Sequence, residues 1–89
     1  MRRRGKVDKN HAEIRAFVRA HGVLWCDTSD IGGGFADAIL CWNDTLVLVE
    51  VKDKRGALTP QQVAFHEDWP VVVIRNQEDA AKVVRKMKG

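Results

Sequence analysis

The chain has 89 residues, of which 45% are hydrophobic and 30% charged, and its formal net charge is +3. This length allows one domain with a thin core, and the composition excludes a disordered or fibrous protein. No apolar run approaches the roughly 18 residues of a membrane span. No apolar segment follows the basic start either, so we expect neither a membrane segment nor a secretory signal.

Helix and strand patterns alternate along the chain and predict one α/β domain over residues 1–89, with a flexible basic arm over residues 1–8. The predicted elements are, in chain order, a helix over 10–21, strands over 23–27, 35–42 and 45–52, a helix from Pro60 that ends before Pro70, a strand over 71–74, and a last helix capped by Asn76. Their types follow from apolar spacing, which has a period of 3.6 residues in helices and alternates in strands. The order is therefore α-β-β-β-α-β-α.

Three local signals sharpen these elements. Thr59 before Pro60, with Gln62 three residues after the threonine, predicts a capping box at a helix start. The continuously apolar strand over 71–74 is of the type that is buried on both faces. The glycines of 32–34 allow the backbone to turn sharply or to approach another segment closely.

The cysteines and histidines do not show the spacing that is typical of a metal site. Cys26 and Cys41 lie in apolar runs without a CxxC pair, and we interpret them as reduced core residues of a cytoplasmic protein. The three histidines have no close ligand partners, which argues against a zinc site, although His66 lies near Gln62 on its helix and can border a site there.

Three basic clusters are compatible with phosphate binding or with a solvated surface. They are Arg2, Arg3 and Arg4; Lys52, Lys54 and Arg55; and Lys82, Arg85, Lys86 and Lys88.

Acidic residues stand inside two strongly apolar predicted strands. If residues 43–44 form the tip of a symmetric hairpin, Trp42 faces Thr45. The same register sets Asp37 opposite Glu50, with β-carbons about 5 Å apart, which is destabilising for like charges.

A proton or a cation can relieve this repulsion. One carboxyl can keep its proton at neutral pH because its neighbour raises its pKa. Alternatively, a divalent cation such as Mg²⁺ lies between the two carboxylates, and Lys52 on the same face adds a positive charge nearby. Two acids and a lysine at a strand end suit metal-assisted phosphodiester hydrolysis. The competing interpretation is an exposed acid at a strand start and an ordinary ion pair at a strand end.

The acid after the glycine-rich loop and the later E-x-K resemble the PD-(D/E)xK nuclease superfamily, and more closely its small, often phage-encoded, stand-alone VRR-Nuc domains. The supporting stretches, in the family's order, are KNHAEIRAFVRAHG, GGGFADAIL, VLVEVKDK, LTPQQVAFHEDW and VVVIRNQEDA. The resemblance implies a restriction-endonuclease-like core, a mixed central sheet flanked by helices. It also implies Mg²⁺- or Mn²⁺-dependent cleavage of DNA, without an organic cofactor, by a homodimer similar to Holliday-junction resolvases.

The resemblance assigns roles to particular residues. Asp37 and Glu50 match the metal-binding acids, Lys52 matches the catalytic lysine, and the carbonyl of Val51 matches an additional metal ligand. The family usually has proline directly before the first acid, where this chain has Ala36. This departure affects the backbone support of the acid and leaves the chemistry in place.

Two further matches have an alternative structural explanation. Glu13 matches an acid on the first helix that helps to hold metal, but it also forms a helix-start pair with Asn10. Gln62 matches a glutamine near the acids, but it also completes the capping box with Thr59.

The sequence thus predicts a metal-dependent endonuclease that acts on branched or structured DNA such as Holliday junctions. The candidate DNA-binding residues are Arg2, Arg3, Arg4, Lys54 and Arg55. The alternative is a catalytically silent nuclease-fold module for DNA binding or assembly.

Overall fold

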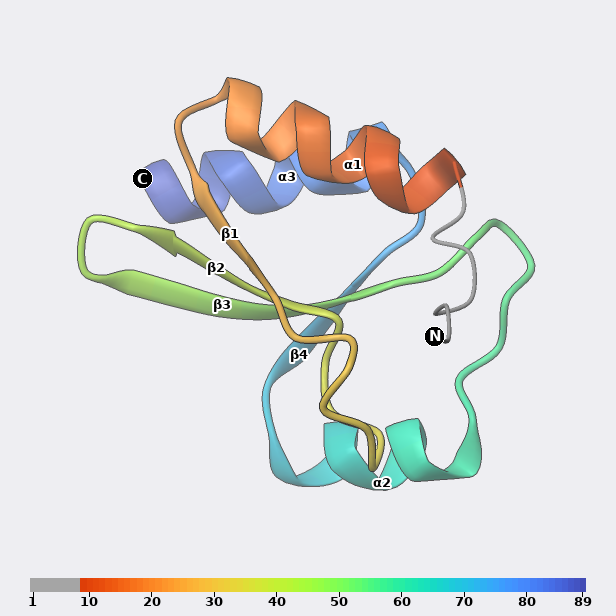
Figure 1. Cartoon of the computed structure of the whole chain (residues 1–89). Helices are drawn as coiled ribbons and strands as arrows, with labels where there is room; N and C mark the ends of the chain where they lie inside the picture. Colours follow the sequence, from red (N-terminus) through yellow and green to blue (C-terminus); the bar gives the residue numbers. More distant parts are fainter. Residues whose placement is uncertain (1–8) are drawn as a thin grey trace.

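Residues 9–89 are described by the computed structural model, which has one four-stranded mixed sheet and three helices (Figure 1). The elements are α1 (Lys9–Ala20), β1 (Leu24–Asp27), β2 (Ala38–Trp42), β3 (Thr45–Val51), α2 (Pro60–Asp68), β4 (Val71–Ile74) and α3 (Gln77–Lys88). This confirms the predicted α/β class and the predicted order. The basic arm predicted over 1–8 lies outside the described residues. In the described part of the chain, no helix is long and apolar enough to cross a membrane.

The sheet has the strand order β1-β2-β3-β4, in which the first two pairings are antiparallel and the last is parallel. Trp42 lies opposite Thr45, so the predicted hairpin register is confirmed. Asn43 adopts a positive φ of 55° at the tip, a conformation that asparagine tolerates better than most residues. Glu50 therefore lies on one central strand, and Asp37 directly precedes the other.

One face of the sheet is covered by α1 and α3, which lie side by side above it (Figure 1). The apolar core between them includes Ile14 and Val18 from α1, Leu40 and Val49 from the hairpin, and the α3 stripe. That stripe consists of Ala80, Val83, Val84 and Met87, as the helical spacing predicts. Asn76 caps α3 by accepting a hydrogen bond from the backbone N–H of Asp79 at 2.8 Å.

The turn from α1 into β1 is set by one glycine. Gly22 has a φ of 82°, and its N–H donates to the carbonyl of Arg19 while the N–H of Val23 donates to that of Val18. These two bonds form a Schellman motif, which satisfies the last carbonyls of the helix and turns the chain back over the sheet. Val23 is buried directly after the turn and joins the core.

The opposite face of the sheet, here called the outer face, is more open. Its side chains alternate with those of the core face, so that it carries Leu24 and Leu46, both 68% exposed, and Cys26, which is also exposed. The prediction that Cys26 lies in the core is therefore wrong, because the outer face has no α1–α3 layer over it. Cys41, on the same face, is half-buried.

Strand β4 forms one edge of the sheet, and Val72 is 41% exposed. The prediction that the strand over 71–74 is buried on both faces is therefore wrong. A continuously apolar run does not distinguish an edge strand from a central one, because its neighbours are set by the tertiary fold.

Strand β2 begins three residues later than predicted. In residues 35–37 the regular ladder gives way to other bonds: the N–H of Asp37 donates to the carbonyl of Val49 at 2.9 Å, and the carbonyl of Asp37 accepts from the N–H of Thr28 at 2.8 Å. The buried hydroxyl of Thr28 also donates to the carbonyl of Ala36 at 2.7 Å. The segment before β2 is thus held by β1 and its loop, and this places Asp37 just beyond the last regular pair of β2 and β3.

Candidate active site

The candidate site is built around Glu50, near the end of β3 and on the outer face. Its side chain is 1% exposed, although its strand neighbours on that face are only half-buried or exposed. Helix α2 lies on the side of the sheet opposite to α1 and α3 (Figure 1), and its Gln62 contacts the Glu50 carboxyl. A carboxyl with so little contact to water is costly to ionise.

Both carboxyl oxygens of Glu50 face α2. Gln62 Nε2 donates a hydrogen bond to Glu50 Oε2 at 3.0 Å, and His66 Nε2 lies 3.9 Å from Glu50 Oε1. Within residues 9–89, neither Glu50 Oε1 nor His66 Nε2 has a hydrogen-bond partner, and both atoms are buried. Because Gln62 and His66 are one helical turn apart, the same face of α2 presents both side chains to the carboxyl.

Asp37 joins the two central strands through its side chain. The last paired residues of the hairpin are Ala38 and Val49. Beyond them, Asp37 Oδ2 accepts a hydrogen bond from the N–H of Val51 at 2.8 Å, in place of a backbone carbonyl. The N–H and C=O of one strand residue point toward the same edge, so the carbonyl of Val51 is also directed toward the gap between β2 and β3.

Asp37 and Glu50 interact, as the hairpin register predicts. Burial, together with the hydrogen bond and the negative charge of Asp37, raises the pKa of Glu50 from 4.5 to about 8, while the charge of Lys52 acts in the opposite direction. The neutral acid is therefore the favoured form of Glu50 at pH 7 when no cation is bound.

Lys52 follows two residues after Glu50 and has its backbone held on both sides. Its N–H donates to the carbonyl of Ile74 at 3.1 Å, and its carbonyl accepts from Asn10 Nδ2 at 3.1 Å. A β-carbon added at Gly56 would lie 3.3 Å from Lys52 Cδ, so the following loop passes close over the lysine stem. Lys52 is half-buried and close enough to Glu50 to lower its pKa.

Gln62 completes the predicted capping box and also contacts Glu50. Its Oε1 accepts from the backbone N–H of Thr59 at 2.9 Å, and its backbone N–H donates to Thr59 Oγ1 at 3.2 Å, which completes the capping box. Its amide nitrogen remains free to donate to Glu50. The helix start and the buried acid are therefore coupled through one side chain.

The glycine loop packs directly against α2. Gly34 has a φ of 85°, and a β-carbon there would lie 2.4 Å from the carbonyl oxygen of Gln61. Any larger residue would push the helix away from the sheet. Next to this contact, the rings of Phe35 and Phe65 have their centroids 5.0 Å apart. These contacts fix α2 over Glu50. They also show that α2 is the segment that the glycine loop approaches closely.

The remaining predicted site residues lie apart from the Asp37–Glu50 pair. Glu13 is exposed near the start of α1 and forms an ion pair with Lys9 at 4.0 Å. Within residues 9–89, no group of three or more His, Cys, Asp and Glu side chains is placed to hold a metal ion. Lys54 and Arg55 are exposed in the loop after β3. Arg2, Arg3 and Arg4 lie outside the described residues.

Sequence reasoning missed two residues that position the loop after β3. Arg75 Nη1 donates to the carbonyls of Asp53 and Gly56 at 2.8 and 2.7 Å. Asn10 Nδ2 reaches the carbonyls of Lys52 and Arg75. The partners of Arg75 are 22 and 19 positions away and those of Asn10 are 42 and 65 positions away, so no local sequence signal marks these contacts.

Comparison with known proteins gives no further assignment, since no family model matches the chain and no curated protein sequence is significantly similar to it.

Proposed function

We propose that this chain is a metal-dependent endonuclease with a restriction-endonuclease-like core, acting on branched or structured DNA. The observation that carries the proposal is the buried Glu50 carboxyl beside Asp37, with its pKa raised to about 8, at the end of the regular pairing between two central strands. Strongly perturbed carboxyls with a specific charged neighbour are typical of functional sites. Lys52, two residues further on, completes the E-x-K arrangement.

The donor groups present fit a hard divalent cation such as Mg²⁺ or Mn²⁺. The carboxylates of Asp37 and Glu50 and the carbonyl of Val51 would hold the ion, and oxygen donors of this kind are the ones it prefers. Glu50 Oε1 is buried without a hydrogen-bond partner in the described part of the chain, which supports a missing ligand. Glu13 remains a candidate ligand that would have to turn away from Lys9. When bound, the ion would lower the pKa of a coordinated water and neutralise charge on the phosphate.

The chain's own side chains prepare this site. Asp37 holds the N–H of Val51, so the carbonyl of the same residue stays directed toward the acids. Gln62 fixes one oxygen of Glu50 and leaves the other for a ligand. The Lys52 ammonium would orient the attacking water or a phosphate oxygen and stabilise negative charge that develops in the transition state.

The proposed partners are DNA and a second copy of the chain. Lys54 and Arg55 project from the loop next to Lys52, where they would contact backbone phosphates, and Arg2, Arg3 and Arg4 would extend this contact. The exposed Leu24 and Leu46 on the outer face supply an apolar surface of the kind that homodimers bury. A DNA substrate implies a cytoplasmic location, in a bacterial or phage-infected cell.

The second candidate function is a silent module that binds DNA without cutting it. The position of Glu13 favours this candidate, because its ion pair with Lys9 leaves two acidic side chains at the site. In that case Glu50 keeps its proton permanently and serves as a hydrogen-bond partner for α2.

A cleavage assay separates the two candidates. Labelled four-way junction, flap, single-stranded and linear duplex DNA are incubated with Mg²⁺, Mn²⁺ or EDTA, and Lys52→Ala is compared with Lys54→Ala. We expect metal-dependent cuts, a loss of at least about a hundredfold in rate for Lys52→Ala, as for other removed electrostatic stabilisers, and a much smaller loss for Lys54→Ala. Symmetric paired cuts in the junction would support a resolving dimer.

Thermal stabilisation by Mg²⁺ tests the metal site independently of turnover. A stabilisation that Asp37→Asn abolishes supports the site under either function. Intact substrates that nevertheless bind tightly would favour the silent module.

A further inference from the structure

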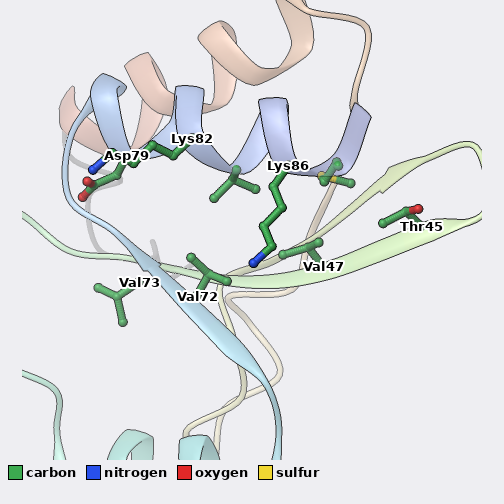
Figure 2. A pocket seen from close by; sticks show the side chains of 9 residues that line it. Thr45, Val47, Val72, Val73, Asp79, Lys82 and Lys86 are labelled. Atoms are coloured by element: carbon green, nitrogen blue, oxygen red, sulfur yellow. The ribbon is translucent and has the colours of Figure 1, made fainter. Parts of the chain in front are cut away.

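A groove runs between α3 and the strands β3 and β4 (Figure 2). The residues that line it include neither Asp37 nor Glu50. Its apolar part is formed by Val47, Val72, Val83 and Met87, and Lys82 and Lys86 stand at its rim. The volume of about 580 Å³ lies in the range of ligand-binding clefts, which is roughly 300–1,000 Å³. The groove therefore has the size and the composition of a binding site.

The same groove borders an open sheet edge. The N–H of Lys52 donates to the carbonyl of Ile74, so Ile74 and, two residues before it, Val72 turn their backbone groups toward β3. Val71 and Val73 alternate with them and turn their N–H and C=O groups outward, where β4 has no neighbouring strand within residues 9–89. Such an edge can accept a further strand, and Val73 itself lines the groove.

The rim of the groove is positive. Lys82 and Lys86 are both exposed and lie one turn apart on α3, and Figure 2 shows the side chain of Lys86 extending from the helix toward the strands. One helical turn is about 5.4 Å, close to the roughly 6.7 Å between alternate residues of a strand. Asp79, at the far end of the groove, accepts a hydrogen bond from the N–H of Arg75 at 2.9 Å. Figure 2 shows Lys82 extending along α3 toward Asp79, so Lys86 is the lysine directed at the strands, and acidic side chains on the α3-facing side of an added strand would lie near this rim.

We propose that β4 and the groove bind an extended segment of a partner protein whose α3-facing side chains are acidic at two alternate positions and apolar on either side. Backbone bonds to β4 would supply affinity, and the groove would supply specificity. A second copy that pairs through its own β4 would bring a second Lys82–Lys86 pair to the junction, where the positive charges would repel each other. The segment over 1–8 contains Arg2, Arg3 and Arg4 and is therefore also positively charged. Charge complementarity thus selects an acidic partner.

The test uses a fluorescent seven-residue peptide with blocked ends, in which odd positions carry Val, Glu, Glu and Val and even positions carry Thr. Fluorescence anisotropy against the whole chain should show saturable binding that weakens with salt. A peptide with Lys in place of both Glu residues should bind at least about tenfold more weakly. Absence of saturable binding by the acidic peptide would overturn the proposal.

Two isomeric peptides test the strand geometry without altering the protein. One is N-methylated on its odd amides and the other on its even amides. Since alternate residues of a strand face opposite edges, one isomer should lose binding by at least about tenfold while the other keeps it. Equal effects of the two isomers would rule out strand addition.

Charge reversal on α3 locates the site. We expect Lys86→Glu to weaken binding of the acidic peptide by about tenfold at low salt, and Arg85→Glu, the exposed neighbour that does not line the groove, by less than about twofold. Equal losses would show that only net charge matters, and would overturn the assignment to the groove. Concentration-dependent self-association that Lys86→Glu strengthens, or loss of duplex DNA binding in Lys86→Glu alone, would assign the groove to a second copy or to DNA instead.

Discussion

The two faces of the sheet are closed by different physical means. On the core face, α1 and α3 bury a continuous apolar cluster with no charged group in it. On the outer face, α2 buries no residue of its own completely, and its attachment depends on Gln62, His66, the ring of Phe65 and the close approach of Gly34. Apolar packing therefore stabilises one face, while the other is arranged around a single acid.

The two faces therefore contribute differently to stability and to the proposed site. Burial of apolar area is non-directional and favourable, so the α1–α3 layer makes the fold robust. Above its unfolded pKa a buried acid lowers the stability of the folded protein, and under the proposed function it would serve as a ligand for a cation. The proposed site thus lies in the part of the molecule that contributes least to its apolar core.

The largest effect on stability is expected from a matched pair of leucines on the central hairpin. Leu40 is fully buried on the core face, whereas Leu46 is 68% exposed on the outer face. We expect Leu40→Ala to lower the free energy of unfolding by about 2–5 kcal/mol, and Leu46→Ala by less than about 0.5 kcal/mol, in urea denaturation. Similar losses for both variants would show that the outer face is also covered, as in a dimer.

The next effect concerns Glu50 and pH. Its pKa rises from 4.5 to about 8 on folding, so the folded state binds the proton more tightly than the unfolded state. The stability of the metal-free protein should therefore be highest below pH 4.5, as far as this group is concerned, and should fall as the pH rises toward about 8. Glu50→Gln keeps the hydrogen bond from Gln62 and removes the titration. In EDTA at pH 8, we expect the free energy of unfolding of this variant to exceed that of the wild type by on the order of a few kcal/mol.

The same titration predicts how metal binding depends on pH. Because the cation requires the ionised carboxylate, its apparent affinity should increase up to about pH 8 and then level off. Calorimetry at several pH values in buffers of different ionisation enthalpy measures the affinity and the proton released. A Mg²⁺ affinity independent of pH between 5 and 8 would contradict the assignment of Glu50 as a ligand.

A smaller effect on stability is expected from removal of the two helix caps. Because α2 and α3 lie on opposite faces of the sheet, the two variants compare the faces directly. Thr59→Ala and Asn76→Ala each remove one side-chain cap, at a cost of about 1 kcal/mol. Since α2 has no buried apolar residue, we expect Thr59→Ala to speed amide hydrogen exchange in α2 alone, without a matching loss of global stability. Asn76→Ala should instead lower global stability, because α3 carries part of the core. Identical exchange patterns in the two variants would refute the distinction.

The smallest effect is expected at His66, where the 3.9 Å distance to Glu50 Oε1 is too long for a hydrogen bond. His66→Ala should change stability by less than about 1 kcal/mol in EDTA, because no hydrogen bond is lost. In the cleavage assay it should raise the Mg²⁺ concentration needed for half-maximal rate, and His66→Gln should restore part of the difference if the imidazole orients the carboxyl. A large loss of stability would mean that His66 is mainly a packing residue.

The amino-acid sequence alone determined the element order, the hairpin register, the caps of α2 and α3 and the facing of Asp37 and Glu50, because each follows from spacing within about a dozen residues. Tertiary structure decided the rest. It placed β4 at an edge despite its apolar run and left Cys26 exposed, since a strand's neighbours are set by distant segments. It also brought Gln62 and His66 over Glu50 and tied Arg75 and Asn10 to the loop after β3. The raised pKa of Glu50 belongs to this second group, because the extent of burial exists only once α2 has packed against the sheet.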